Sequence, residues 1–226
     1  MLREGRQVGA YSMTKPYSIP LSEIRREQTV VNSRFIGTLA PAASIDEART
    51  FIARIKKEFA DATHNVPVYV IGGGNTVTEF CGDDGEPAGT AGKPALTVLR
   101  TSGLGDAALV ITRYFGGTKL GTGGLVKAYT EAAQSVVNAV GRGRRVPVHV
   151  ALAVIPYNLL ERVRLLVKKD GGEVLAEDFG GDITLTLRFP VDVFEAFQEG
   201  LRELSAGKVR AEVVETVEMV VPFFES

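Results

Sequence analysis

The amino-terminal part of the chain carries short runs of alternating apolar and polar residues, followed by a helical pattern. Residues 23–31 and 33–39 are rich in β-branched and aromatic residues, with a turn between them, and predict two strands. From Ser44 to Phe59, apolar residues recur at steps of three and four, which predicts a helix with one buried face. Ser44 and Glu47 have the spacing of a capping box, so we expect the helix to begin there.

The following stretch alternates apolar runs with glycine-rich segments. Glycine and asparagine at 72–75 indicate a turn between two strands. Residues 107–111 are apolar at every position, which is typical of a central strand buried on both faces. The elements expected here are strands over 66–71, 76–81 and 107–111, a short helix over 94–99 and a long helix over 123–141.

Beyond residue 147 the pattern becomes regular. Alternating strands and amphipathic helices follow in the order strand, helix, strand, strand, helix, strand, which is the ferredoxin-like split βαβ arrangement. The polar, glycine-rich segment 142–147 before it reads as a linker. The sequence therefore predicts an α+β protein with a loosely ordered extension at 1–16, one domain over 17–141, a linker over 142–147 and a second domain over 148–226.

Composition excludes several classes of protein. No apolar run approaches the roughly 20 residues that a membrane span needs, and the first 16 residues lack the apolar core of a signal peptide. Cys81 is the only cysteine, so no internal disulfide can form. These features predict a cytoplasmic protein with no contact to membranes.

The net charge of −1 conceals a difference between the two parts of the chain. Residues 1–146 contain 18 Lys and Arg against 13 Asp and Glu, which gives +5, whereas residues 147–226 contain 8 against 14, which gives −6. If the protein binds nucleic acid, the amino-terminal domain is the expected face.

The second glycine-rich loop, residues 113–125, precedes the long helix and carries no acidic residue. Unpaired N–H groups at a helix start suit phosphate, and Tyr114 and Phe115 can stack on bases. Tight packing of the glycines, with the aromatic rings in the core, is the alternative. The candidate phosphate- or nucleic-acid-binding residues are Arg113, Gly116, Gly117, Lys119, Gly121, Gly123, Gly124 and Lys127, together with Lys93 from the first loop.

The first glycine-rich loop, residues 82–94, is acidic. It resembles part of a P-loop, but Pro87 stands at the first glycine of that motif and Pro94 replaces its hydroxyl residue, so a P-loop is excluded. Asp83, Asp84 and Glu86 could hold Mg²⁺, pair with Arg113 or Lys93, or lie in solvent. We predict no metal, no cofactor and no catalytic residue, and the lone His64 is expected to have a structural or polar-surface role.

The two loops also carry a resemblance to a known family. Asp83-Asp-Gly-Glu-Pro-Ala-Gly-Thr-Ala-Gly-Lys-Pro94 and the block from Arg113 to Tyr129 look like the two signature blocks of the IMPACT/YigZ family. With Ser33-Arg-Phe-Ile36 and Thr63-His-Asn65, the similarity covers roughly residues 17–140, and Ala88, where the family pattern has serine, is a minor departure. The acidic carboxy-terminal part is similar to the extra domain of bacterial YigZ-type members.

The resemblance implies a fold for each domain and a role in translation. The amino-terminal domain would have the left-handed βαβ fold of elongation factor G domain IV and some ribosomal proteins, and the second domain would be ferredoxin-like. Eukaryotic members of the family act in translational control, and the resemblance carries over no catalytic residue.

Three functional hypotheses follow. The leading one is a non-catalytic, translation-associated regulator that contacts RNA or the ribosome, or a translation-related protein, through its amino-terminal domain. The second is an enzyme that binds a nucleotide or phosphate ligand with both loops. The third is a protein-interaction adaptor that uses the acidic carboxy-terminal domain. The sequence does not define the oligomeric state.

Overall fold

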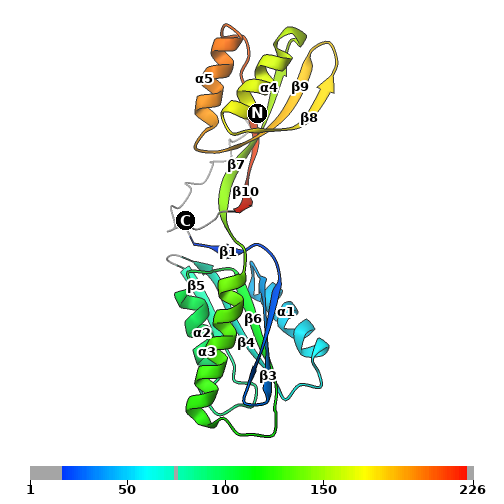
Figure 1. Cartoon of the computed structure of the whole chain (residues 1–226). Helices are drawn as coiled ribbons and strands as arrows, with labels where there is room; N and C mark the ends of the chain where they lie inside the picture. Colours follow the sequence, from blue (N-terminus) through cyan, green and yellow to red (C-terminus); the bar gives the residue numbers. More distant parts are fainter. Residues whose placement is uncertain (1–16, 74–75, 223–226) are drawn as a thin grey trace, which may run out of the picture. The chain divides into compact units, whose positions relative to one another are not determined.

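The structure is a computed structural model that describes residues 17–73 and 76–222 (Figure 1). The expected extension at 1–16 and two residues of the expected 72–75 turn lie outside the described residues. The chain divides into two compact units, the second of which is Arg145–Val221. The predicted α+β architecture with two domains is confirmed.

The first unit is built on one five-stranded sheet. The strands lie in the order β2-β3-β6-β4-β5, and each neighbouring pair is antiparallel. Every strand and helix predicted for this part of the chain is present, with ends that differ by a few residues. In chain order, the elements are β1 (Ile19–Pro20), β2 (Ile24–Val30), β3 (Ser33–Pro41), α1 (Ile45–Glu58), β4 (His64–Gly73), β5 (Thr76–Cys81), α2 (Gly92–Thr101), β6 (Ala107–Tyr114) and α3 (Gly121–Ala139).

The central strand β6 is buried on both faces, as its uninterrupted apolar sequence predicts. Ala108 and Val110 pack in the cluster that includes residues of α1. Ala107, Leu109 and Ile111 point the other way and pack with residues of α2 and α3. The sheet is therefore covered by α1 on one face and by α2 and α3 on the other (Figure 1).

The order of strands requires a left-handed crossover. Helix α1 joins the parallel strands β3 and β4, and α2 joins the parallel strands β5 and β6. Viewed from one face of the sheet with the strands of each pair pointing up, the connection from β3 to β4 and the connection from β5 to β6 both move to the same side. Because their helices cover opposite faces, the two crossovers have opposite hands, although nearly all such connections in proteins are right-handed. One of them is thus left-handed, in agreement with the expected fold.

The same topology places the two glycine-rich loops at one end of the sheet. One loop follows β5 and the other follows β6, and these two strands are parallel. Strands β3 and β4 are antiparallel to β6, so their first residues, Ser33 and His64, lie at that end as well. The candidate site is therefore assembled from four strand ends that are distant in sequence.

Residues 142–147 are not the irregular linker that their glycine-rich sequence predicted. They form the first part of strand β7 (Arg142–Ile155), and the first two of them pair with β1. Pairing satisfies backbone groups that an isolated segment would leave to solvent, so a tertiary contact overrides the local sequence. The boundary between the two units falls within this strand.

The second unit has the predicted strand-helix-strand-strand-helix-strand order. Strand β7 pairs with β9 and with β10, and β9 pairs with β8. The apolar positions of β7 and β9 pack with those of α4 and α5 in one core. The elements after β7 are the 3-10 helix η1 (Tyr157–Leu159), α4 (Leu160–Lys169), β8 (Glu173–Phe179), β9 (Ile183–Pro190), α5 (Phe194–Leu204) and β10 (Glu212–Pro222).

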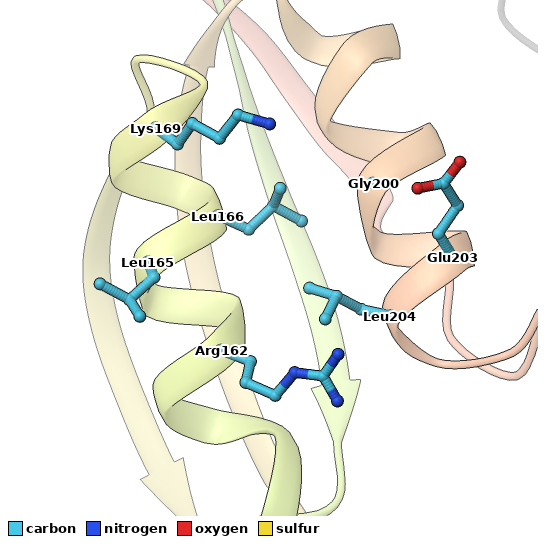
Figure 2. Close-up of a pocket in the computed structure, with 7 residues that line it drawn as sticks. All are labelled: Arg162, Leu165, Leu166, Lys169, Gly200, Glu203 and Leu204. Atoms are coloured by element: carbon cyan, nitrogen blue, oxygen red, sulfur yellow. The ribbon is translucent and has the colours of Figure 1, made fainter.

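Helices α4 and α5 lie side by side and leave a groove between them (Figure 2). Gly200 allows the close approach, because a Cβ atom there would lie 2.8 Å from Cδ1 of Leu166. Arg162, Lys169 and Glu203 line this groove of about 470 Å³ together with leucine side chains. No helix in the described part of the chain is both long and apolar enough to span a membrane.

Candidate functional site

Asp83 organises the first loop through backbone hydrogen bonds. Its Oδ2 accepts from the N–H of Gly89 at 2.8 Å, and its Oδ1 accepts from the N–H groups of Gly92 at 2.8 Å and Ala91 at 3.2 Å. These donors lie at the start of α2, where N–H groups lack partners within the helix. Burial raises the pKa of Asp83, but the three backbone donors and Lys93 outweigh it and hold the pKa below its usual value. Asp83 therefore acts as a cap for the loop and helix.

Asp84 links the same loop to α1 and β4. Its carboxylate accepts hydrogen bonds from the Lys56 ammonium and from the N–H of Asn65 at 2.7 Å, and its carbonyl oxygen lies 2.8 Å from Nδ1 of His64. Burial raises the pKa of Asp84, whereas Lys56 and the Asn65 N–H lower it, and the net direction is downward. The carboxylate is thus committed to structure.

Glu86 is buried together with Arg113, which the sequence analysis named among the candidate phosphate-binding residues. Their exposed fractions are 8% and 4%. Nη1 of Arg113 donates to Oε1 of Glu86 at 2.6 Å, and the hydroxyl of Tyr129 donates to the same oxygen at 2.8 Å. Burial and the neighbouring Glu86 carboxylate raise the pKa of Tyr129, so it remains a donor. Arg113 is buried and paired, so it is not free to contact phosphate in the way that its sequence position predicted.

The guanidinium of Arg113 has further contacts around this pair. Nη2 donates to the Ser33 hydroxyl at 3.3 Å. The guanidinium carbon lies 5.4 Å from the ring centroid of Phe35 and 5.5 Å from that of Phe115. Its Nε finds no hydrogen-bond partner among residues 17–73 and 76–222.

The acidic residues of the first loop are each held by separate donors. Each of the three carboxylates has a different set of donors, which are backbone N–H groups, a lysine, an arginine or a tyrosine. No group of three His, Cys, Asp or Glu residues that could hold a metal ion occurs in the described ranges. Of the alternatives for this loop, pairing with Arg113 holds for Glu86, whereas Asp84 pairs with Lys56 and Asp83 accepts from backbone N–H groups.

The glycines of the second loop differ in what they do. A Cβ atom on Gly116 would lie 2.0 Å from the carbonyl oxygen of Asn32, so this glycine allows close packing against the β2–β3 turn. Gly117 and Gly121 have φ of +83° and +69°, in the left-handed region that favours glycine. A Cβ atom on Gly123 would meet open space, whereas one on Gly124 would lie 3.1 Å from the Cβ of Leu120.

Helix α3 begins at Gly121 without a side-chain cap, because Leu120 occupies the cap position. The first N–H groups of a helix have no partner within the helix and carry a partial positive charge. No acidic residue lies in the first turn of α3. This turn therefore presents donors that a side chain of the helix does not use.

The two loops meet at a cavity of about 450 Å³ beside the start of α3. Of the residues predicted to bind phosphate, Arg113, Lys119 and Gly121 line it. Gly116, Gly117, Gly123, Gly124, Lys93 and Lys127 are not among its lining residues. The full lining is Thr63, His64, Glu86, Pro87, Arg113, Phe115, Lys119, Leu120, Gly121, Thr122 and Leu125.

Lys119 is the exposed cation of the cavity. It forms no salt bridge with any residue that the structure describes. Lys93 is also exposed but belongs to the first turn of α2, and Lys127 lies 3.8 Å from Glu131 on α3. The positive charge at the cavity is thus concentrated on Lys119 and the helix start.

His64 and Thr63 line the cavity, although the sequence suggested no ligand-binding role for either. Nδ1 of His64 contacts a carbonyl oxygen, which can only accept, so this nitrogen carries a proton. Nε2 lies 3.7 Å from Oε1 of Glu86. The strand register that pairs His64 with Arg113 is what brings the histidine to the site, and no local motif encodes that register.

Comparisons with known proteins cover both units. Residues 31–137 match the Impact N-terminal domain, and residues 154–208 match a domain of unknown function, DUF1949. An IMPACT family member from Haemophilus influenzae is 36% identical over 200 residues, which cover 88% of this chain and 97% of the relative. IMPACT family member YigZ of Escherichia coli is 31% identical over 87% of this chain and 97% of its own length. A crystal structure of a hypothetical protein, 31% identical, covers 88% of this chain and 98% of its own, with a TM-score of 0.58.

Removal of the negative charge opposite Arg113 is expected to destabilise the amino-terminal domain strongly. Glu86→Gln leaves a buried guanidinium without its counter-charge, which typically costs about 3–5 kcal/mol of unfolding free energy. Urea denaturation at neutral pH measures this loss. Glu27→Gln, which breaks the exposed pair between Glu27 and Arg34, is the matched control and should cost far less. Equal losses for the two variants would contradict a special role for the buried pair.

The cap formed by Asp83 predicts a pH-dependent contribution to stability. Because its folded pKa lies below the unfolded value, the carboxylate stabilises the protein above about pH 4, and this contribution is lost as the pH falls through the folded pKa. Asp83→Ala should cost roughly 1 kcal/mol at pH 7, and less as the pH falls below 4. Denaturation of the wild type and of Asp83→Ala between pH 7 and pH 3 tests this. A difference in unfolding free energy between the two that stays constant over the whole range would disprove it.

Proposed function

Because the chain belongs to the IMPACT family, we propose that it is a non-catalytic, translation-associated regulator that contacts RNA or the ribosome through the cavity where α3 begins. Translational control is the field in which eukaryotic members of the family act. The proposal of RNA contact depends on the physical chemistry of the cavity.

One observation carries the proposal: buried residues of the domain neutralise the carboxylate of Glu86 at the cavity. Glu86 is the acidic residue of the lining, and it accepts from two buried donors, Arg113 and Tyr129. Its charge therefore does not oppose an anion at the cavity. Lys119 and the first N–H groups of α3 remain available, and both suit a phosphate group.

The non-catalytic part of the proposal draws support from the same contacts. For a carboxylate to act as a general acid or base it must change its protonation, and to bind a metal it must change its ligands. Asp83 and Asp84 are held as anions by structural donors, and Glu86 is held by its buried pair. The acidic groups that a two-loop enzyme would use are thus committed to the fold.

Titration of RNA at several salt concentrations tests the contact. Each phosphate charge that the protein neutralises should contribute about −0.7 to the slope of log K against log salt on single strands. Lys119→Ala should make the slope less steep by about this amount. Lys57→Ala, an exposed lysine of α1 on the other side of the sheet, is the matched control and should leave the slope unchanged.

Two results would contradict the proposal. One is a wild-type protein that binds no RNA even at low salt. The other is a slope that Lys119→Ala leaves unaltered, since phosphate would then be bound elsewhere.

A protein partner at the second unit is a second candidate, favoured by the groove between α4 and α5. Leu166 and Leu204 point into the space between the helices, and Arg162 and Lys169 flank them (Figure 2). Leu165, 68% exposed, also lines the groove but points away from α5. Neither cation forms a salt bridge with any residue in the described ranges. An amphipathic helix with acidic residues would match this combination of apolar surface and unpaired cations.

This candidate predicts an interaction that does not depend on RNA. A partner captured by the full chain should remain bound after nuclease treatment, because the groove would contact protein and not RNA. Leu165→Glu should abolish its capture, whereas Val154→Glu, at another exposed apolar position of the same unit, should not. Loss of the partner on nuclease treatment would exclude the groove as its binding site.

A further inference from the structure

Phe115 has the features of a preformed stacking surface. Its side chain is 45% exposed and lines the cavity. The guanidinium of Arg113 lies 5.5 Å from the ring centroid, and the backbone N–H of Phe115 donates to the Thr63 hydroxyl at 3.0 Å. The ring is thus positioned by a buried cation and by a neighbouring strand end before any ligand binds. Tyr114, the other aromatic residue of this loop, is engaged by Asp61 through its hydroxyl.

The cavity combines this ring with the anion-binding elements. Phe115, Lys119 and Gly121, the first residue of α3, all line the same space of about 450 Å³. Pockets for small ligands typically measure about 300–1,000 Å³, so one nucleotide matches its size and a rigid duplex does not enter it. Arg113 also lines the cavity, and its buried Nε–H has no acceptor among the described residues.

The rest of the amino-terminal unit offers little for a long nucleic-acid track. Helix α1 covers the middle of one face of its sheet and α2 and α3 cover the other, so the exposed sheet surface is limited to the edge strands β2 and β5. Most of its cations are paired with carboxylates. Binding that neutralised many phosphates would first have to break these pairs. The geometry therefore favours contact with few nucleotides at one place.

From these observations we infer that the cavity takes a single unstacked nucleotide of RNA, with its base on Phe115 and its phosphate at Lys119 and the first turn of α3. This inference rests on the proposed RNA contact and specifies its substrate class. The target is a single strand, a bulge or an overhanging end, because a base inside a duplex cannot leave its stack without cost. Stacking accepts any base, so little sequence preference is expected.

The experiment compares three RNAs with the full chain at one low salt concentration. The probes are an unstructured 12-nucleotide RNA, a blunt duplex of the same length, and that duplex with a two-nucleotide 3′ overhang. We expect the single strand and the overhang to bind and the blunt duplex to bind much more weakly. Fluorescence anisotropy gives the three dissociation constants.

Two substitutions then locate the base. Phe115→Leu keeps an apolar side chain but removes the stacking ring, and it should weaken binding of the single strand roughly 5- to 150-fold. Phe80→Leu is the matched control, because Phe80 is also exposed, at 43%, but stacks on Tyr69 of the same sheet. It should leave RNA binding unchanged. Equal thermal midpoints of the wild type and Phe115→Leu would verify that the exposed substitution leaves the fold intact.

The outcomes separate this inference from the proposed function. If RNA binds but the blunt duplex binds as well as the single strand, or Phe115→Leu has no effect, the single-nucleotide inference is overturned and RNA contact stands. If the wild type binds no RNA, both fall. Titration with adenosine monophosphate completes the experiment. Binding of the mononucleotide without binding of the RNAs would overturn the inference and identify a free-nucleotide site.

Discussion

The buried ion pair between Glu86 and Arg113 is the interaction on which the candidate site depends. It joins the first loop to the end of the central strand, and Tyr129 of α3 and Ser33 of β3 complete its hydrogen bonds. Taking two charges out of water is costly, and only good geometry with additional hydrogen bonds offsets that cost. Because the partners come from four elements, the pair specifies how the loops, the sheet and α3 meet.

The same pair determines the electrostatics of the cavity. Arg113 and Glu86 form a buried ion pair, so each neutralises the charge of the other. What remains is weaker and more local: one exposed lysine and the start of a helix that has no side-chain cap. Such a site suits one phosphate better than a long backbone, which is why the modest net charge of the domain is compatible with nucleic-acid contact.

The topology explains why these groups lie together at all. Two crossovers of opposite hand make β5 and β6 parallel, and the antiparallel neighbours β3 and β4 begin where those strands end. Both glycine-rich loops, Ser33 and His64 therefore gather at one end of the sheet. The glycines then serve separate needs there, which are close packing at Gly116 and left-handed backbone at Gly117 and Gly121.

The sequence by itself determined the local elements: the strands from their alternation, α1 from its period and its Ser44 cap, and the two loops from their glycines. It also carried the family, because two long blocks are read directly from the residue order. Only the tertiary structure decided which charges pair, that His64 joins the site, and that residues 142–147 form a strand. The physical reason is the distance along the chain over which each interaction acts. Periodicity and capping act between residues a few positions apart, whereas Glu86 and Arg113 are 27 positions apart and meet only when the sheet has formed.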